Sequence, residues 1–142
     1  MLRVNDLMTA PVFSLLETDS LFSARSLMDL QRIRHIPVTS ADNEFIGLVT
    51  HRDILSATIS QLAELDAEAQ NEIDAGIPIR EIMQTGIVTV AEDTLLKEAA
   101  QTLLNHKFGC LPVVEDGRLV GILTEADFLR LTINLMEALD NE

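Results

Sequence analysis

Basic residues are scarce in this chain, and their scarcity argues against several classes of function. The 142 residues contain ten Lys and Arg against 23 Asp and Glu, which gives a net charge of −13. Nucleic-acid binding draws its affinity from clustered basic charge, and anionic membrane surfaces attract the same charge. The composition therefore argues against general DNA or RNA binding and against docking on an anionic membrane.

Cysteine and long apolar runs are also lacking. The one cysteine, Cys110, cannot form an internal disulfide, which favours a reducing cytoplasm. No apolar run approaches the roughly 18–20 residues of a membrane span. The acid Asp6 lies where a secretory signal would carry its apolar stretch. We therefore expect a cytoplasmic protein without a membrane segment.

Aromatic residues are few, with five Phe and no Trp or Tyr, whereas 47% of the chain is hydrophobic. Aliphatic packing must therefore build the core. A chain of this length can bury roughly 68–70% of its unfolded surface, so it is long enough to fold as one compact domain. Collagen-like, coiled-coil and disordered classes do not fit this composition.

An internal repeat organises the sequence. A shift of 75 positions aligns Asp6-Leu7-Met8 with Glu81-Ile82-Met83, and His35-Ile36-Pro37-Val38 with Cys110-Leu111-Pro112-Val113. After a one-residue deletion, a shift of 74 aligns residues 46–53 with residues 120–127. The matched Pro, Gly, Thr and Asp residues keep their order and spacing, which indicates a duplication.

Both copies predict strand, helix, strand, strand, helix. The first strands are expected at residues 12–15 and 87–90, and Asp19-Ser20 and Asp93-Thr94 are start signals for the first helices. A hairpin turn is expected at residues 115–117. The last helices should begin at Thr50 and Thr124. Apolar residues at helical spacing mark the buried faces of the first helices: Leu21, Ala24 and Met28, and Leu96, Ala99 and Leu103.

Residues 57–79 join the copies and contain five acids but no Lys or Arg. We expect a solvated acidic helix that ends at Gly76, either as a structural connector or as an acidic face for a partner. We assign the first repeat to residues 1–60, the helical connector to 61–76 and the second repeat with its C-terminal helix to 77–142. In that last helix Phe128, Leu131, Leu135 and Leu139 share a face, which could pack on the core or form a dimer.

The most informative motif is Gly47-Leu48-Val49-Thr50-His51-Arg52-Asp53, echoed by Gly121-Ile122-Leu123-Thr124-Glu125-Ala126-Asp127. One interpretation is a capping box, in which Thr caps a helix and Asp bonds back to the amide of Thr. The other uses the same atoms for ligand binding. A carboxylate in the first helical turn can accept hydrogen bonds from the two hydroxyls of a ribose, and the positive helix end favours phosphate.

These motifs resemble a tandem pair of cystathionine-β-synthase (CBS) domains over practically the whole chain. The resemblance rests on Pro-Val followed by the Gly-h-h-Thr-x-x-Asp pattern, present twice, and on the openings Asp6-Leu7-Met8 and Glu81-Ile82-Met83. It implies an α+β fold of two βαββα repeats related by a pseudo-twofold axis. Modules of this family commonly bind AMP, ADP, ATP or S-adenosylmethionine in two clefts between the repeats, and they usually pair into flat dimers.

The resemblance also implies the binding residues. Thr50 and Asp53 would hold the ribose in one cleft, and Thr124 and Asp127 in the other. Each cleft would be completed by the opening strand of the opposite repeat, around Ile87-Val88 or Val12-Phe13. The segments before each proline would line the adenine and phosphate side: Arg34, His35 and Ile36 in one repeat, and Gly109, Cys110 and Leu111 in the other.

The two copies differ in charge near this motif. Arg34, His35, His51 and Arg52 accompany Asp53, whereas Gly109, Cys110, Glu125 and Ala126 take the equivalent positions around Asp127. Guanidinium groups bind phosphate through paired hydrogen bonds. We therefore expect a phosphorylated ligand to prefer the Asp53 side, unless these four are ordinary surface cations.

Other chemistry has little support in the sequence. His35, His51, His106 and Cys110 lack metal-ligand spacing, no nucleophile-elbow motif is present, and Cys110 is expected to be a buried inert thiol. We expect a non-catalytic sensor module that reversibly binds an adenosyl ligand without a cofactor and signals to a partner protein as a homodimer. A ligand-independent dimerisation or scaffold protein is the alternative, and a small enzyme is the third hypothesis.

Overall fold

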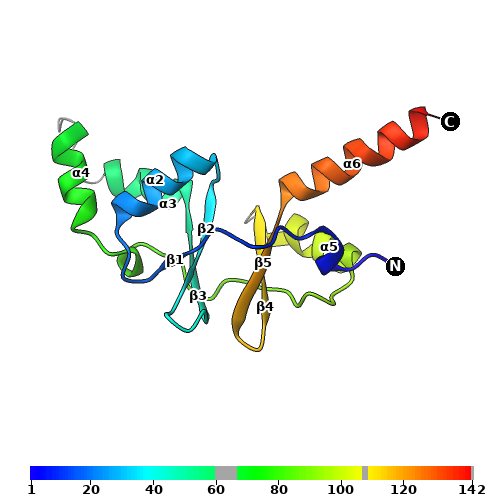
Figure 1. Ribbon diagram of the computed structural model, residues 1–142, viewed down its shortest axis with the longest axis horizontal. Coiled ribbons are helices and arrows are strands. Elements are labelled where there is room, and N and C mark those ends of the chain that lie inside the picture. Colours follow the sequence, from blue (N-terminus) through cyan, green and yellow to red (C-terminus); the bar gives the residue numbers. More distant parts are fainter. Residues whose placement is uncertain (60–66, 107–108, 142) are drawn as a thin grey trace. The chain divides into compact units, whose positions relative to one another are not determined.

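The computed structural model describes residues 1–59, 67–106 and 109–141, and the chain divides into two compact units. Unit 1 combines Met1–Val12 with Val88–Glu142, and unit 2 is Phe13–Ile87. Figure 1 shows the order of the elements along the chain. The predicted boundaries at 1–60, 61–76 and 77–142 divide the sequence repeats and stay a prediction. The compact units are divided differently, because each unit includes a short segment from the other repeat. We call these two segments, residues 1–12 in unit 1 and residues 77–87 in unit 2, the opening segments.

Unit 2 contains a three-stranded sheet with the order β1-β2-β3, in which β1 runs parallel to β2 and β3 runs antiparallel to it. The expected first strand over residues 12–15 is shorter and later, because only Leu15 and Leu16 pair with β2. The elements are β1 (Leu15–Leu16), α2 (Leu21–Gln31), β2 (His35–Thr39), β3 (Phe45–Thr50), α3 (His51–Ile59), α4 (Ala67–Ala75) and the 3₁₀ turn η1 (Ile79–Glu81).

Unit 1 repeats this plan with a two-stranded sheet. The expected strand over residues 87–90 is reduced to a single parallel bridge between Val90 and Val113. Asp116 and Gly117 form the hairpin turn with φ of 51° and 80°, which confirms the turn expected there. The elements are α1 (Val4–Leu7), α5 (Leu96–His106), β4 (Cys110–Glu115), β5 (Arg118–Thr124) and α6 (Glu125–Asp140). The α+β class with two related repeats is therefore confirmed.

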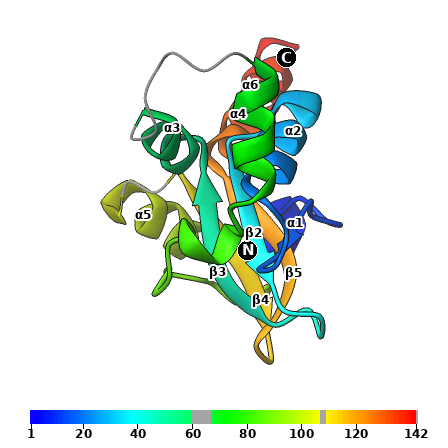
Figure 2. The same cartoon turned by 90° about the vertical axis from the view of Figure 1, so that its left-hand side faces the viewer.

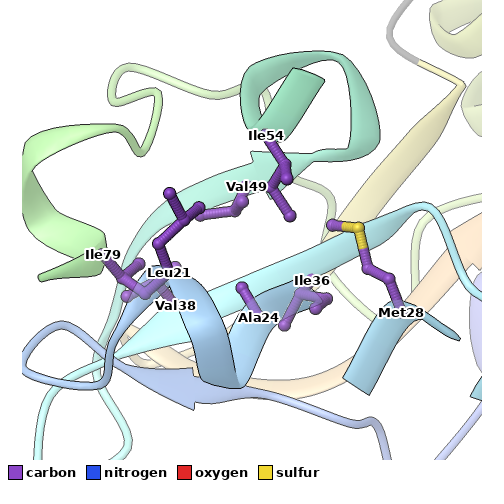
Figure 3. Close-up of a cluster of buried hydrophobic side chains, with 8 residues drawn as sticks. All are labelled: Leu21, Ala24, Met28, Ile36, Val38, Val49, Ile54 and Ile79. Carbon is purple, nitrogen blue, oxygen red and sulfur yellow. The ribbon is translucent and has the colours of Figure 1, made fainter. Parts of the chain in front are cut away.

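Each unit has its own aliphatic core, and each opening segment contributes to it. Ile79 in unit 2 and Val4 in unit 1 are fully buried within these clusters. Figure 3 shows the unit 2 cluster, in which Leu21, Ala24 and Met28 point from α2 toward the sheet. The predicted buried faces of the first helices are confirmed in both units. The remaining members are Ile36, Val38, Val49 and Ile54 in unit 2, and Leu96, Ala99, Leu103, Leu111, Val113 and Leu123 in unit 1.

The first helices begin differently in the two units. Ser20 caps α2, since its hydroxyl accepts a hydrogen bond from the Ser23 amide at 3.1 Å. The predicted start signal of the other first helix, Asp93-Thr94, lies one residue too early to cap it. The residue directly before α5 is Leu95, since α5 begins at Leu96. An opening segment also supplies an acceptor in each unit. The Leu21 amide donates to the Ile77 carbonyl at 2.8 Å, and the Leu96 amide donates to the Leu2 carbonyl at 2.9 Å.

The connector is helical over α4, which ends at Ala75 just before Gly76, as predicted. Residues 60–66 lie outside the described residues. The expectation of a solvated acidic face is wrong at Asp74, which is fully buried and pairs with Arg25 of α2 at 2.8 Å. A buried carboxylate is stable when a cation compensates its lost hydration, and α2 provides that cation. Figure 2 shows α4 beside α2.

The apolar residues of α6 divide between core and surface. Phe128 and Leu131 pack against the unit 1 core. Leu135 and Leu139 are 57% and 69% exposed, and three further large apolar side chains of the same helix, Leu129, Ile133 and Met136, are also exposed. The first half of the helix therefore anchors it, and the second half presents an apolar surface. Among the described residues, no helix is both long and apolar enough to cross a membrane.

Candidate functional site

In unit 2 the candidate site is built where β3 ends and α3 begins. One carboxylate oxygen of Asp53, Oδ2, accepts hydrogen bonds from the Thr50 amide at 2.8 Å and the Thr50 hydroxyl at 2.9 Å. The Asp53 amide in turn donates to the Thr50 hydroxyl oxygen at 3.2 Å. This is the reciprocal capping box that Thr-x-x-Asp predicts. It fixes the carboxylate in the first turn of α3, beside the positive end of the helix dipole.

The other carboxylate oxygen of Asp53 faces the opening segment. Asp53 Oδ1 accepts a hydrogen bond from the side-chain amide of Gln84, Nε2, at 2.9 Å. Because Asp53 is only partly buried, Oδ1 is the oxygen that a ligand hydroxyl would contact. Gln84 was missed by the sequence analysis. Its position directly after the Glu81-Ile82-Met83 opening was the available signal.

The β2–β3 pairing brings the predicted cations of unit 2 to the same edge. His35 lies opposite Thr50 in the antiparallel register, and the His51 amide donates to the Arg34 carbonyl at 2.9 Å. Arg34 and Arg52 are exposed, whereas His35 and His51 are half-buried. The backbone of these four residues therefore converges near the start of α3. Ile36 is fully buried in the core, so its contact with a ligand would involve backbone atoms.

Unit 1 builds the same capping box with a more deeply buried acid. Asp127 Oδ2 accepts hydrogen bonds from the Thr124 amide at 2.8 Å and from the Thr124 hydroxyl at 3.3 Å. Asp127 Oδ1 accepts from the Thr9 hydroxyl at 3.1 Å and from the Arg130 guanidinium at 2.5 Å. Only 3% of Asp127 is exposed. The sequence analysis missed Thr9 and Arg130, although Arg130 follows Asp127 at a spacing that places both on one helix face.

The motif glycines allow the opening segments to approach the strands closely. A Cβ on Gly47 would lie 2.8 Å from the Met83 sulfur and 2.9 Å from the Gln84 carbonyl oxygen. A Cβ on Gly121 would lie 2.7 Å from the Met8 sulfur and 3.1 Å from the Thr9 carbonyl oxygen. Each motif glycine therefore faces the methionine of the opening segment that comes from the other copy of the repeat.

Cys110 occupies the position of His35 in unit 1, and its thiol is buried. Burial raises the pKa of Cys110 to about 12, because the apolar surroundings disfavour the thiolate. Cys110 pairs with Thr124 in the antiparallel register, and the Glu125 amide donates to the Gly109 carbonyl at 3.2 Å. Leu111 belongs to the unit 1 core. These residues lie next to Asp127 but offer no cation.

Two further features concern the described residues as a whole. Among them, no three His, Cys, Asp or Glu side chains gather in a way that could hold a metal ion.

A hollow of about 330 Å³ lies in unit 1 between the N-terminus, α5 and α6, with Leu2, Lys97 and Phe128 among its lining residues. None of the predicted site residues lines this hollow.

The repeated fold and the paired Thr–Asp elements define a tandem CBS module. The sequence matches the CBS domain over residues 4–60 and again over residues 79–134, so the chain belongs to the CBS domain family. It is 29% identical over 128 residues to the uncharacterized protein MJ1225 of Methanocaldococcus jannaschii, covering 90% of this chain and 42% of that protein. It is 32% identical over 126 residues to an inosine-5'-monophosphate dehydrogenase of Staphylococcus saprophyticus, covering 87% and 22%. The chain thus spans less than half of each relative.

Solved structures resemble the chain over nearly its whole length. A protein assigned to acetoin utilization, AcuB, of Vibrio cholerae is 37% identical with a TM-score of 0.84, covering 100% of this chain and 98% of that one. CBSX2 in complex with AMP is 27% identical with a TM-score of 0.79, covering 96% and 99%. The CBS domain pair of MJ0100, in complex with 5'-methylthioadenosine and S-adenosyl-L-methionine, is 27% identical with a TM-score of 0.77, covering 94% and 98%.

Proposed function

We propose that this chain is a non-catalytic regulatory module that reversibly binds an adenosine-containing ligand, AMP, ADP, ATP or S-adenosylmethionine, and signals to a partner protein. The observation that carries the proposal is the Asp53 carboxylate. It is fixed by Thr50 through one oxygen, is only partly buried, and turns its other oxygen toward the neutral amide of Gln84. A ribose diol can replace an amide donor at that oxygen without leaving a buried charge uncompensated. Similar modules crystallised with AMP or S-adenosylmethionine support the ligand class.

The cations of unit 2 favour a phosphorylated ligand at the Asp53 element. Arg34 and Arg52 are exposed and lie beside the first turn of α3. Phosphate is favoured by guanidinium groups and by a helix N-terminus. The CBS resemblance implies that the ligand lies between the repeats, and this location is part of the proposal.

Titration calorimetry with AMP, ATP and S-adenosylmethionine tests this proposal. Asp53→Ala should weaken binding at least tenfold, since the carboxylate that would contact the ribose is lost. Asp42→Ala is the matched control, because it removes an equal charge from an exposed turn of the same unit. No heat of binding for any of the three ligands, and no rise in melting temperature with them, would contradict the proposal.

The alternative is a ligand-independent dimerisation or scaffold protein, and two observations favour it. Both Thr-x-x-Asp elements form complete capping boxes, so their presence requires no ligand. The second half of α6 exposes an apolar face that a second copy could cover. A homodimer is part of either function. Sedimentation of wild type and Ile133→Glu at several concentrations should show a dimer that the charge disrupts, whereas identical monomers would exclude pairing through α6.

A cytoplasmic location and the absence of catalysis also belong to the proposal. The single cysteine supports a reducing compartment. Incubation of the protein with each adenosyl ligand should leave the ligand unchanged by mass, and conversion of any of them would indicate an enzyme instead.

A further inference from the structure

The matched carboxylates differ in what occupies their second oxygen. In unit 2, Asp53 Oδ1 accepts a hydrogen bond from the uncharged side-chain amide of Gln84. In unit 1, Asp127 Oδ1 accepts from the uncharged Thr9 hydroxyl and also from the Arg130 guanidinium at 2.5 Å. The opening segments therefore provide one neutral donor in each unit, and unit 1 adds a cation.

The difference comes from a single position of the repeat. Arg130 lies three residues after Asp127 on α6, and side chains at this spacing share a helix face. The shift of 74 that aligns Asp127 with Asp53 aligns Arg130 with Ser56 of α3. Serine carries no charge and cannot form the same ion pair with a carboxylate. Unit 2 therefore lacks the cation that unit 1 has at this position.

We propose that Arg130 determines which unit binds the adenosyl ligand, by occupying the Asp127 oxygen that a ribose hydroxyl would need. The inference rests on the proposed function. A carboxylate interacts more strongly with a hydrogen-bonded guanidinium cation than with a neutral hydroxyl donor, because both partners carry charge. A ribose at Asp127 would therefore exchange a stronger contact for a weaker one, whereas a ribose at Asp53 displaces only an amide. Each chain then binds one adenosyl ligand tightly, at Asp53.

The side-chain positions are compatible with this role. The Asp127 side chain is 3% exposed and that of Arg130 is 65% exposed, so the guanidinium covers the acid from the solvent side. An alternative explanation is that the deep burial of Asp127 alone keeps a ligand away from it, whether or not Arg130 is present. Removing the cation while keeping the acid separates these two explanations.

Calorimetry with AMP on two reciprocal variants tests the inference. Wild type should bind one AMP per chain. Arg130→Ser, which copies unit 2, should add a second site or strengthen the weaker one severalfold. Ser56→Arg, which copies unit 1, should weaken the Asp53 site severalfold. Arg118→Ser and Leu55→Arg are the controls: they make the same charge changes at the far end of β5 and off the Asp53 face of α3, and they should leave both stoichiometry and affinity unchanged.

The outcomes distinguish this inference from the proposed function. Two equal sites in wild type, or an Arg130→Ser protein that folds and still binds a single AMP, would overturn the role of Arg130 and leave the ligand class intact. Loss of binding in Asp127→Ala but not in Asp53→Ala would also overturn it. No binding of AMP, ATP or S-adenosylmethionine by wild type or either variant would overturn both. Melting temperatures within a few degrees of wild type would confirm that the variants are folded.

Discussion

The opening segments of unit 2 and unit 1 make the same backbone contacts, but the charged side chains at the two candidate sites differ. In unit 2, Gln84 and Leu48 exchange amide–carbonyl hydrogen bonds at 2.8 and 2.9 Å, and in unit 1, Thr9 and Ile122 do so at 2.8 and 3.1 Å. The backbone contacts thus survived duplication in both units. Charged contacts did not, because their energy depends on the side chain present rather than on the shared backbone. Shape is conserved between the copies, whereas binding chemistry is free to diverge.

The largest difference in stability between the units is expected at their ion pairs. Arg25→Met leaves the fully buried Asp74 without its guanidinium and should destabilise unit 2 by about 3 kcal/mol. Arg130→Met should cost under about 1 kcal/mol, because Arg130 is mostly exposed and Asp127 keeps the donors Thr124 and Thr9. Urea unfolding of both variants measures the two costs. Equal costs would contradict the assignment of Arg25–Asp74 as the structural pair.

The motif glycines should be the next most sensitive positions. Gly47→Ala places a methyl group 2.9 Å from a backbone oxygen, whereas the closest backbone oxygen to a Cβ on Gly121 is 3.1 Å away. We expect Gly47→Ala to cost about 2 kcal/mol by overpacking, and Gly121→Ala to cost less. Gly76→Ala is the control, since its nearest neighbour is at an ordinary 3.5 Å. Urea midpoints that rank Gly121→Ala as the more damaging change would show that the Met sulfurs, rather than the backbone oxygens, decide the cost.

A smaller difference is expected at the first helices. Ser20→Ala removes the cap of α2 and should destabilise unit 2 by about 1 kcal/mol. Unit 1 has Leu95 at this position and no such cap to lose. Ser14→Ala, an exposed serine outside the helices and strands, is the control. Thermal unfolding compares the three proteins, and a Ser20→Ala protein as stable as the control would argue that the Ile77 carbonyl alone is enough to start α2.

The smallest difference concerns pH. The pKa of Cys110 is about 12 in the folded chain against an ordinary 9.0, so the unfolded chain releases this proton first as the pH rises. Stability is therefore fully present below pH 9 and falls above it, by about 0.8 kcal/mol between pH 7 and 9.5. Urea unfolding at the two pH values should show a loss smaller by this amount in Cys110→Ala. Rapid alkylation of the native thiol at pH 8 would contradict the burial that causes the shift.

Much of the fold could be predicted, because it follows from the spacing of apolar residues and from the residues that end helices and form turns. The buried faces of α2 and α5, the hairpin at Asp116, and the end of α4 before Gly76 follow from local rules that need no partner. The short first strands could not be predicted, since pairing partners decide strand length.

The site was predicted unevenly, for a similar reason. The Thr50–Asp53 and Thr124–Asp127 pairs lie within one helical turn, so the sequence alone reveals the capping boxes. Gln84, Thr9 and the partner of Asp74 come from distant parts of the chain, and only tertiary packing shows which acid each one meets. Arg130 is the exception, because its spacing from Asp127 was visible in the sequence.

The exchange of opening segments affects how the chain can fold during synthesis. Unit 1 needs Met1–Val12, made before unit 2, and Val88–Glu142, made after it. Its core therefore cannot close until the residues that follow unit 2 have left the ribosome, whereas unit 2 consists of one uninterrupted stretch that can close earlier. Gene fragments divided at the repeat boundary should each encode a protein that lacks a buried residue, Ile79 in one and Val4 in the other, so the duplication has made the two copies dependent on one continuous chain.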